Sequence, residues 1–182
     1  MMNSRLPRRV SQLAPAAFLA LASCMNMPEH AKVPNAIAAP AHQTITLETM
    51  AYGDQVYECR AASEDPARFQ WTFKAPEAEL FETAGYRVGR HYAGPTWEAT
   101  DGSKVVGQLM AQSPSPDEKA IPWLLLSAQS TSGKGVFSHV TSIQRVNTTG
   151  GKAPAEGCDS AHAGRSVRVP YTATYYFYSA KP

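Results

Sequence analysis

The sequence predicts an all-β domain, an antiparallel sandwich or partly closed barrel of short strands with long loops. Three observations lead to this prediction. Short apolar runs alternate with polar residues at a period of two, turn residues separate these runs, and no long amphipathic helix interrupts them. Many short strands with frequent turns are typical of sandwiches and barrels.

The first half of the domain contains the clearest strand pattern. Segment 69–74 places Phe69, Trp71 and Phe73 on one face, and segment 55–59 is its expected partner. Further short strands are expected over 86–92, 96–99 and 104–110. Asp101-Gly102 lies between the last two, and Asp-Gly supplies the positive φ angles that a tight hairpin turn requires.

The second half is expected to hold strands over 121–128 and 136–146, a loop rich in Gly and Ala over 148–164, and closing strands over 167–169 and 172–178. The last strand is rich in aromatic residues. Alternation places one set (Tyr171, Tyr175, Phe177) on one face and the other (Tyr176, Tyr178) on the opposite face. Aromatics on both faces suit a central strand covered on both sides, or equally an exposed surface that binds a partner.

The N-terminus has the pattern of an export signal. Three arginines precede an apolar run over 13–21, and no acidic residue occurs before Glu29. The run is much shorter than the ~20 residues that span a bilayer. It ends in Leu21-Ala22-Ser23-Cys24, which resembles the lipobox of bacterial lipoproteins. We therefore expect a lipoprotein-type signal peptide over 1–23 and a lipid on Cys24, which would attach the protein to a membrane.

Two further segments complete the predicted organisation. Residues 24–41 are rich in Ala and Pro and are expected to form a flexible tether, and residues 42–182 are expected to form a single β domain. Met25 is not the aspartate that resembles an inner-membrane retention signal, which favours an outer-membrane lipoprotein of the cell envelope, facing the periplasm or the surface. Removal of residues 1–23 changes the formal charge from +2 to −1. A near-neutral domain without basic clusters is a poor nucleic-acid binder, so no nucleic-acid partner is expected.

Two cysteines remain in the predicted domain, Cys59 and Cys158. A pair of cysteines in an exported protein favours a disulfide, and the alternative is two buried free thiols. In an antiparallel fold, this bond would place the first and last strands close together. In the loop around Cys158, Asp159 or Ser160 is expected to cap a turn.

Six segments of the chain resemble one family. They are QVYEC at 55–59, WTFKAPEAEL at 71–80, VGRHYAGPTWEATDGSKVVG at 88–107, IPWLL at 121–125, GVFSHVTSIQRVNTTGGKAPAEGCDSAHAG at 135–164 and VPYTATYYFY at 169–178. With these motifs the sequence resembles the DUF3455 family of uncharacterised exported proteins. The resemblance spans nearly all of the predicted domain and implies that the domain is complete. It implies no activity.

The candidate ligand-binding residues are His91, Tyr92, Trp97, Glu98 and His139. The stretch from His91 to Glu98 combines a histidine, two aromatics and a carboxylate around a Gly-Pro turn. A ring-shaped ligand can stack on Trp97 or Tyr92 while Glu98 accepts hydrogen bonds. The alternative is structural, with Trp97 in the core and Glu98 as a solvated strand residue.

The sequence identifies no catalytic residue. It contains no G-x-S-x-G, H-E-x-x-H, G-x-x-x-x-G-K-[ST] or G-x-G-x-x-G motif. The histidines are not paired at metal-ligand spacing, so no metal site and no cofactor are predicted. The leading hypothesis is a non-catalytic envelope lipoprotein that binds a small molecule or an envelope component. The alternatives are a hydrolase or isomerase using His91 and Glu98 as acid–base groups, and a structural scaffold.

Overall fold

The computed structural model describes residues 30–181. These residues form eight β-strands and two short 3-10 segments. The strands are β1 (Gln43–Ala61), β2 (Phe69–Phe81), β3 (Arg87–Tyr92), β4 (Thr96–Ala99), β5 (Lys104–Ser113), β6 (Trp123–Ser132), β7 (Ser142–Gly150) and β8 (Ser166–Ala180). The 3-10 segments are η1 (Asn35–Ile37) and η2 (Ser160–His162).

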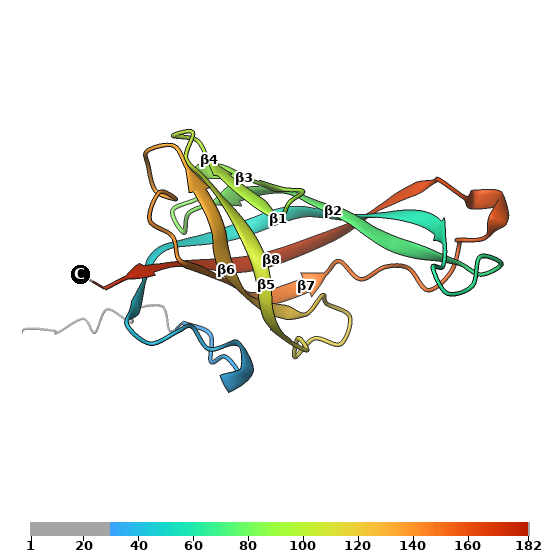
Figure 1. Ribbon diagram of the computed structural model, residues 1–182, viewed down its shortest axis with the longest axis horizontal. Helices are drawn as coiled ribbons and strands as arrows, with labels where there is room; N and C mark the ends of the chain where they lie inside the picture. Colours follow the sequence, from blue (N-terminus) through green and yellow to red (C-terminus); the bar gives the residue numbers. More distant parts are fainter. Residues whose placement is uncertain (1–29, 182) are drawn as a thin grey trace, which may run out of the picture. The chain divides into compact units, whose positions relative to one another are not determined.

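The eight strands form one antiparallel sheet. Each strand pairs with the next one along the chain, and β8 pairs with β1, so the sheet closes into a barrel. The prediction of an all-β antiparallel fold is confirmed. Closure gives every strand two hydrogen-bonded neighbours, which removes the open edges of a sheet. The three longest strands, β1, β2 and β8, continue beyond the others as a twisted ribbon with β1 in the middle (Figure 1).

The hairpins follow the predicted turns, but several strand boundaries differ. The strands expected over 55–59 and 69–74 are parts of the longer β1 and β2, and those expected over 167–169 and 172–178 are one strand, β8. Segments 55–59 and 69–74 pair as expected, with Cys59 opposite Trp71, and Gly102 has a φ of 84° in its turn. The strand predicted over 136–146 begins only at Ser142, because residues 136–139 form a turn. Asp101 holds this turn, since its Oδ2 accepts a hydrogen bond of 2.9 Å from the Val136 N–H.

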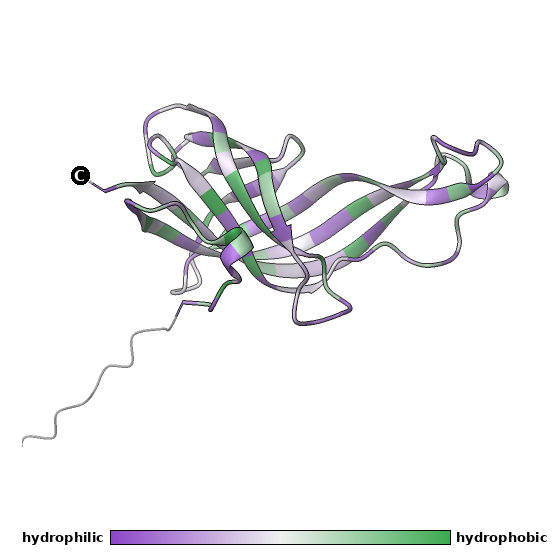
Figure 2. Cartoon of the chain, turned by 60° about the horizontal axis from the view of Figure 1, so that its bottom comes forward, coloured by the Kyte–Doolittle hydropathy of each residue, from purple (hydrophilic) through white to green (hydrophobic). Residues whose placement is uncertain are grey.

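The barrel interior is packed with large side chains. One face of β8 contributes Tyr171, Tyr175 and Phe177, and these pack in the same cluster as Trp97 of β4 and Phe137. Polar and apolar residues alternate along the strands, which is visible as alternating colour in Figure 2. Burial of this inward-facing set removes apolar surface from water and is the main favourable contribution to folding.

A second apolar cluster lies on the outer face of the sheet. Tyr176 of β8, Trp123 of β6 and Val146 of β7 form it together with Ile37 of η1, whose side chain is completely buried. The last strand is therefore covered on both faces, the first of the two arrangements considered for its aromatics. The Nε2 of Gln144 donates to the Ile37 carbonyl, and the Ala31 N–H donates to the Tyr176 hydroxyl.

Part of the segment expected to be a tether lies against the barrel. A flexible tether is expected over residues 24–41, but Ile37 is packed against the barrel. The physical reason is that Trp123 and Tyr176 offer an apolar surface that Ile37 covers. Residues 24–29 of the expected tether lie outside the described residues.

Cys59 and Cys158 form a disulfide with a Cα–Cα distance of 5.4 Å. The bond links β1 to the loop before η2, at the end of the ribbon where β1 pairs with β8. The predicted disulfide and the predicted proximity of the first and last strands are both present. Asp159 caps η2, because its Oδ1 accepts from the N–H groups of Ala161 and His162.

Candidate functional site

The β3–β4 hairpin positions four of the five candidate residues. Its turn contains Gly94, whose φ of 131° disfavours other residues, and the Thr96 hydroxyl closes the turn by donating to the Ala93 carbonyl at 2.9 Å. In the resulting register His91 lies opposite Trp97, and Arg90 lies opposite Glu98. Because side chains alternate between the two faces of a strand, the hairpin sends His91 and Trp97 into the barrel and Glu98 outward.

Inside the barrel, three aromatic rings pack together. The rings of His91 and Trp97 are stacked, with centroids 4.2 Å apart and planes 11° apart. The ring of Tyr175 meets both edge-on, at centroid distances of 5.2 and 5.4 Å. Gly107 of β5 leaves room for this arrangement, since a Cβ there would lie 2.9 Å from Cζ3 of Trp97. The cluster forms one rigid aromatic wall.

His91 is held as a neutral imidazole. Its Nδ1 lies 2.9 Å from the carbonyl oxygen of Thr96, and because a carbonyl only accepts, Nδ1 carries the proton. The side chain is buried, and burial lowers the pKa of His91 to about 3. His91 therefore does not exchange a proton near neutral pH.

The aromatic wall borders a cavity of about 310 Å³. Apolar side chains from several strands complete its lining. The lining residues are Phe73, Lys74, Pro76, His91, Ala93, Gly94, Pro95, Trp97, Leu109, Leu124, Leu126, Arg145 and Tyr175. The cavity is open at one side, because Phe73 and Leu109 are 51% and 53% exposed. Deeper in, the indole Nε1 of Trp97 is buried without a hydrogen-bond partner in the described part of the chain. The buried Tyr175 hydroxyl makes no well-formed hydrogen bond there, but it lies beside the Tyr171 hydroxyl and the Arg145 guanidinium.

Arg145 of β7 is a cavity residue that sequence reasoning missed. It lies opposite Tyr175 of β8 and is only 9% exposed. Its Nε and Nη2 both donate to the carbonyl of Pro122, at 3.2 and 2.9 Å. The sequence carries a signal for it, since Arg145 falls at the same alternating position as Ile143 and therefore on the apolar face of its strand.

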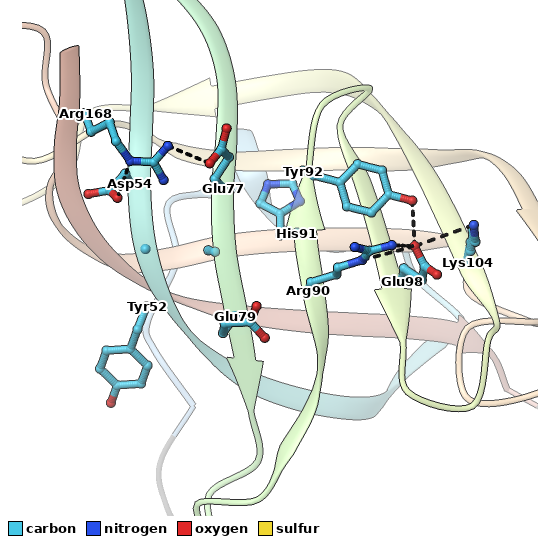
Figure 3. Close-up of a pocket in the computed structure, with 12 residues that line it drawn as sticks. Tyr52, Asp54, Glu77, Glu79, Arg90, His91, Tyr92, Glu98, Lys104 and Arg168 are labelled. Carbon is cyan, nitrogen blue, oxygen red and sulfur yellow. Dashed lines mark hydrogen bonds and ion pairs between the residues drawn. The ribbon is translucent and has the colours of Figure 1, made fainter. Parts of the chain in front are cut away.

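The outer face of the hairpin contributes to a shallow groove of about 550 Å³ (Figure 3). In Figure 3, Arg90, Tyr92 and Lys104 converge on Glu98. The Tyr92 hydroxyl donates to the Glu98 carboxylate at 2.8 Å, and Arg90 and Lys104 lie 2.9 and 3.5 Å from it. The hydrogen bond from Arg90, followed by that from Tyr92, lowers the pKa of Glu98. The Glu98 carboxylate is thus ionised, with partners on the protein itself.

The charged side chains at the other end of the groove also form ion pairs. Arg168 lies between two carboxylates, 3.0 Å from Asp54 and 2.7 Å from Glu77. Figure 3 shows this cluster apart from the one around Glu98. The charged side chains of the groove therefore already have partners of opposite charge, whereas the cavity contains the Trp97 Nε1, which has no partner within residues 30–181.

The structure divides the candidate residues between different places. Trp97 lines the cavity, Tyr92 and Glu98 line the groove, His91 borders both, and His139 lies exposed in the turn before β7. An acid–base pair requires both groups at one substrate. His91 and Glu98 both border the groove, but the His91 ring is buried against Trp97 and its Nδ1 is engaged by the Thr96 carbonyl. Among residues 30–181, no group of three or more metal-binding side chains is present.

The predicted export signal, with the lipid acceptor Cys24, lies outside the described residues. Within residues 30–181, no helix has the length and apolar character needed to cross a bilayer.

One family model matches this chain. Its description is "Protein of unknown function (DUF3455)", and it covers residues 40–179. No curated protein and no solved structure matches the chain. The resemblance seen in the sequence motifs is thereby confirmed.

Proposed function

The chain belongs to the DUF3455 family, and from this premise we propose that its barrel is a non-catalytic domain that binds a small ligand in the inner cavity. One observation carries the proposal. Within residues 30–181 the buried indole Nε1 of Trp97 has no hydrogen-bond partner and the buried Tyr175 hydroxyl makes no well-formed hydrogen bond, and both residues line the same cavity. Buried polar groups in folded proteins are nearly always hydrogen-bonded, so unpartnered groups beside a cavity are suited to a ligand.

The size and lining of the cavity support the same proposal. Small-molecule sites are mostly apolar, contain a few polar groups and begin at about 300 Å³. An apolar cavity of about 150 Å³ accommodates benzene, so a cavity of about 310 Å³ has room for about two rings. Eight-stranded barrels are wide enough to hold one small ligand. The flat faces of His91 and Trp97 are already stacked on each other, which leaves their edges and the Leu side chains to contact the ligand.

The chemistry of the lining supports binding without catalysis. Of the residues that line the cavity, His91 is neutral and donates its proton to a backbone carbonyl. None of the lining residues in the described part of the chain is acidic. The enzyme hypothesis relies on Glu98, which faces the opposite side of the sheet and is engaged by Arg90 and Tyr92.

The cavity mouth offers a matched pair of variants for the test. Leu109 borders the cavity, whereas Met110, the next residue on β5, is 65% exposed and does not line it. We expect Leu109→Trp to obstruct the mouth and Met110→Trp to leave it open. The probe is naphthamide, a neutral two-ring compound, followed through the NMR methyl shifts of Leu124 and Leu126.

Naphthamide is expected to shift these methyl resonances in the native protein and in Met110→Trp, and to do so much less in Leu109→Trp. A native protein whose cavity resonances respond neither to naphthamide nor to naphthoate, its carboxylic acid counterpart, up to their solubility limits would contradict the binding proposal and favour the scaffold.

The proposal extends to the location of the domain. We propose that the protein is exported to the bacterial envelope and held by a lipid on Cys24, and that the envelope supplies the ligand. The support is the sequence pattern of residues 1–24 and the disulfide, which is typical of oxidising compartments. The intact mass of membrane-extracted protein tests it. A mass of residues 24–182 plus lipid is expected, and Cys24→Ser should abolish both processing and membrane association.

A further inference from the structure

The cavity has an unbalanced charge. Its lining contains two cations, Lys74 and Arg145, and no acidic residue. The two cations differ in their surroundings. Lys74 is at the mouth, and its Nζ lies 3.0 Å from Glu58, so its charge is already paired. Arg145 is deep in the barrel, and it makes no ion pair with any residue in the range 30–181.

A buried cation without a counter-ion is unfavourable in a folded protein. Buried charges in proteins are generally paired, because removing a charge from water costs several kcal/mol per ion. The hydrogen bonds of Arg145 to the Pro122 carbonyl orient the guanidinium but leave its net charge uncompensated. The positive charge acts on its surroundings, since Arg145 contributes to lowering the pKa of His91, after the larger effect of burial.

Two hydrogen-bond donors share the cavity with Arg145. Within residues 30–181 the Trp97 Nε1 has no acceptor, and the Tyr175 hydroxyl, opposite Arg145 in the β7–β8 register, lies beside the Arg145 guanidinium and the Tyr171 hydroxyl without a well-formed hydrogen bond. A guanidinium that shares a cavity with such donors matches an anion with several acceptor oxygens, and Arg binds carboxylates with two parallel hydrogen bonds. The remaining walls, formed by residues such as Leu124 and Leu126, are apolar.

We propose that the ligand of the cavity is a carboxylic acid with an apolar body of about two rings, its carboxylate bound by Arg145 and the Tyr175 hydroxyl. This inference rests on the proposed function, because it names the chemical class of ligand for the same cavity. The outer groove is not an equivalent anion site, since its cations Arg90 and Arg168 are already paired with carboxylates.

The test uses two ligands that differ only in charge. Naphthoate carries the carboxylate, and naphthamide is its neutral counterpart of the same size. The affinity of both is measured by calorimetry at neutral pH and constant ionic strength, and cavity occupancy is checked by the methyl shifts of Leu124 and Leu126. Hydrogen bonds to charged groups predict that the native protein prefers naphthoate by about tenfold to a hundredfold.

Variants of Arg145 then assign the preference to its charge. Arg145→Gln should lose the preference for naphthoate while still binding naphthamide, and Arg145→Lys should retain part of it. Tyr175→Phe, which removes only the hydroxyl, should weaken naphthoate binding more than naphthamide binding. It provides a second route if Arg145→Gln does not fold.

The outcomes separate the two proposals. Equal affinity for both ligands overturns the carboxylate inference and leaves the binding function intact. A preference for naphthoate that persists in Arg145→Gln overturns the role of Arg145. If neither ligand occupies the cavity, the proposed binding function itself fails.

Discussion

Removing the Cys59–Cys158 disulfide should destabilise the protein strongly without changing its fold. The two cysteines are 99 positions apart in the sequence. Cross-linking a loop of this length reduces the entropy of the unfolded chain by an amount that corresponds to about 4.7 kcal/mol at room temperature. The free energy of unfolding of a domain of this size is typically only about 5–15 kcal/mol, so the disulfide contributes about a third or more of it. The melting temperature should fall by about 10–20 °C.

The folded state should survive because hydrogen bonds already join the same segments. The Cys59 N–H donates to the Arg165 carbonyl at 2.8 Å, and the Gly164 N–H donates to the Cys59 carbonyl at 2.9 Å. The assay is urea unfolding of the native protein, of the native protein after reduction, and of the double variant Cys59→Ala/Cys158→Ala.

The reduced protein and the double variant should lose similar amounts of stability, and reduction should not affect the double variant. A loss below about 1 kcal/mol in both would refute the argument that the bond acts by restricting the unfolded chain.

Three further predictions concern His91, Ile37 and Glu98. Burial lowers the pKa of His91 from 6.5 to about 3. The contribution of neutral His91 to the free energy of unfolding should therefore be complete above pH 6.5 and be lost as the pH falls towards 3. His91→Phe should flatten the pH dependence of urea unfolding in this range. Ile37→Ala removes a fully buried side chain and should weaken the packing of η1 on the barrel by about 2–5 kcal/mol, seen as faster amide exchange at Ile37 and Ala38, whereas exposed Asn35→Ala should have little effect. Glu98→Gln should leave the affinity for naphthoate unchanged in calorimetry, because the Glu98 carboxylate faces the outer groove; a large loss of affinity would contradict the separation of cavity and groove.

The features that local sequence predicts well are those with a local physical cause. The alternation of β8 follows from the period of two, and the structure places Tyr175 in the interior and Tyr176 on the outer face as this period requires. The turn at Asp101-Gly102 follows from the positive φ that Gly102 adopts. Both features depend only on residues that are close together in the chain.

The candidate site was harder to predict, because residues adjacent in the sequence of a strand point their side chains to opposite faces of the sheet. His91 and Tyr92 are neighbours in the chain, as are Trp97 and Glu98, but neighbours on a strand face opposite sides of the sheet. Alternation along β3 and β4 places the rings of His91 and Trp97 inside the barrel, and the side chains of Tyr92 and Glu98 on its outer face. His139 belongs to neither, since the residues before β7 form a turn that leaves its side chain exposed.

By itself, the sequence determined the fold class, the strand pairing of the first hairpins, the cysteine pair and the membership of the family. Only the tertiary structure decided that the sheet closes on itself, that Ile37 covers its outer face, and that Arg145 meets Tyr175 and Trp97 at one cavity. The physical reason is that local conformation depends on neighbouring residues. A cavity and its unbalanced charge, in contrast, arise from the register between strands that lie far apart in the chain.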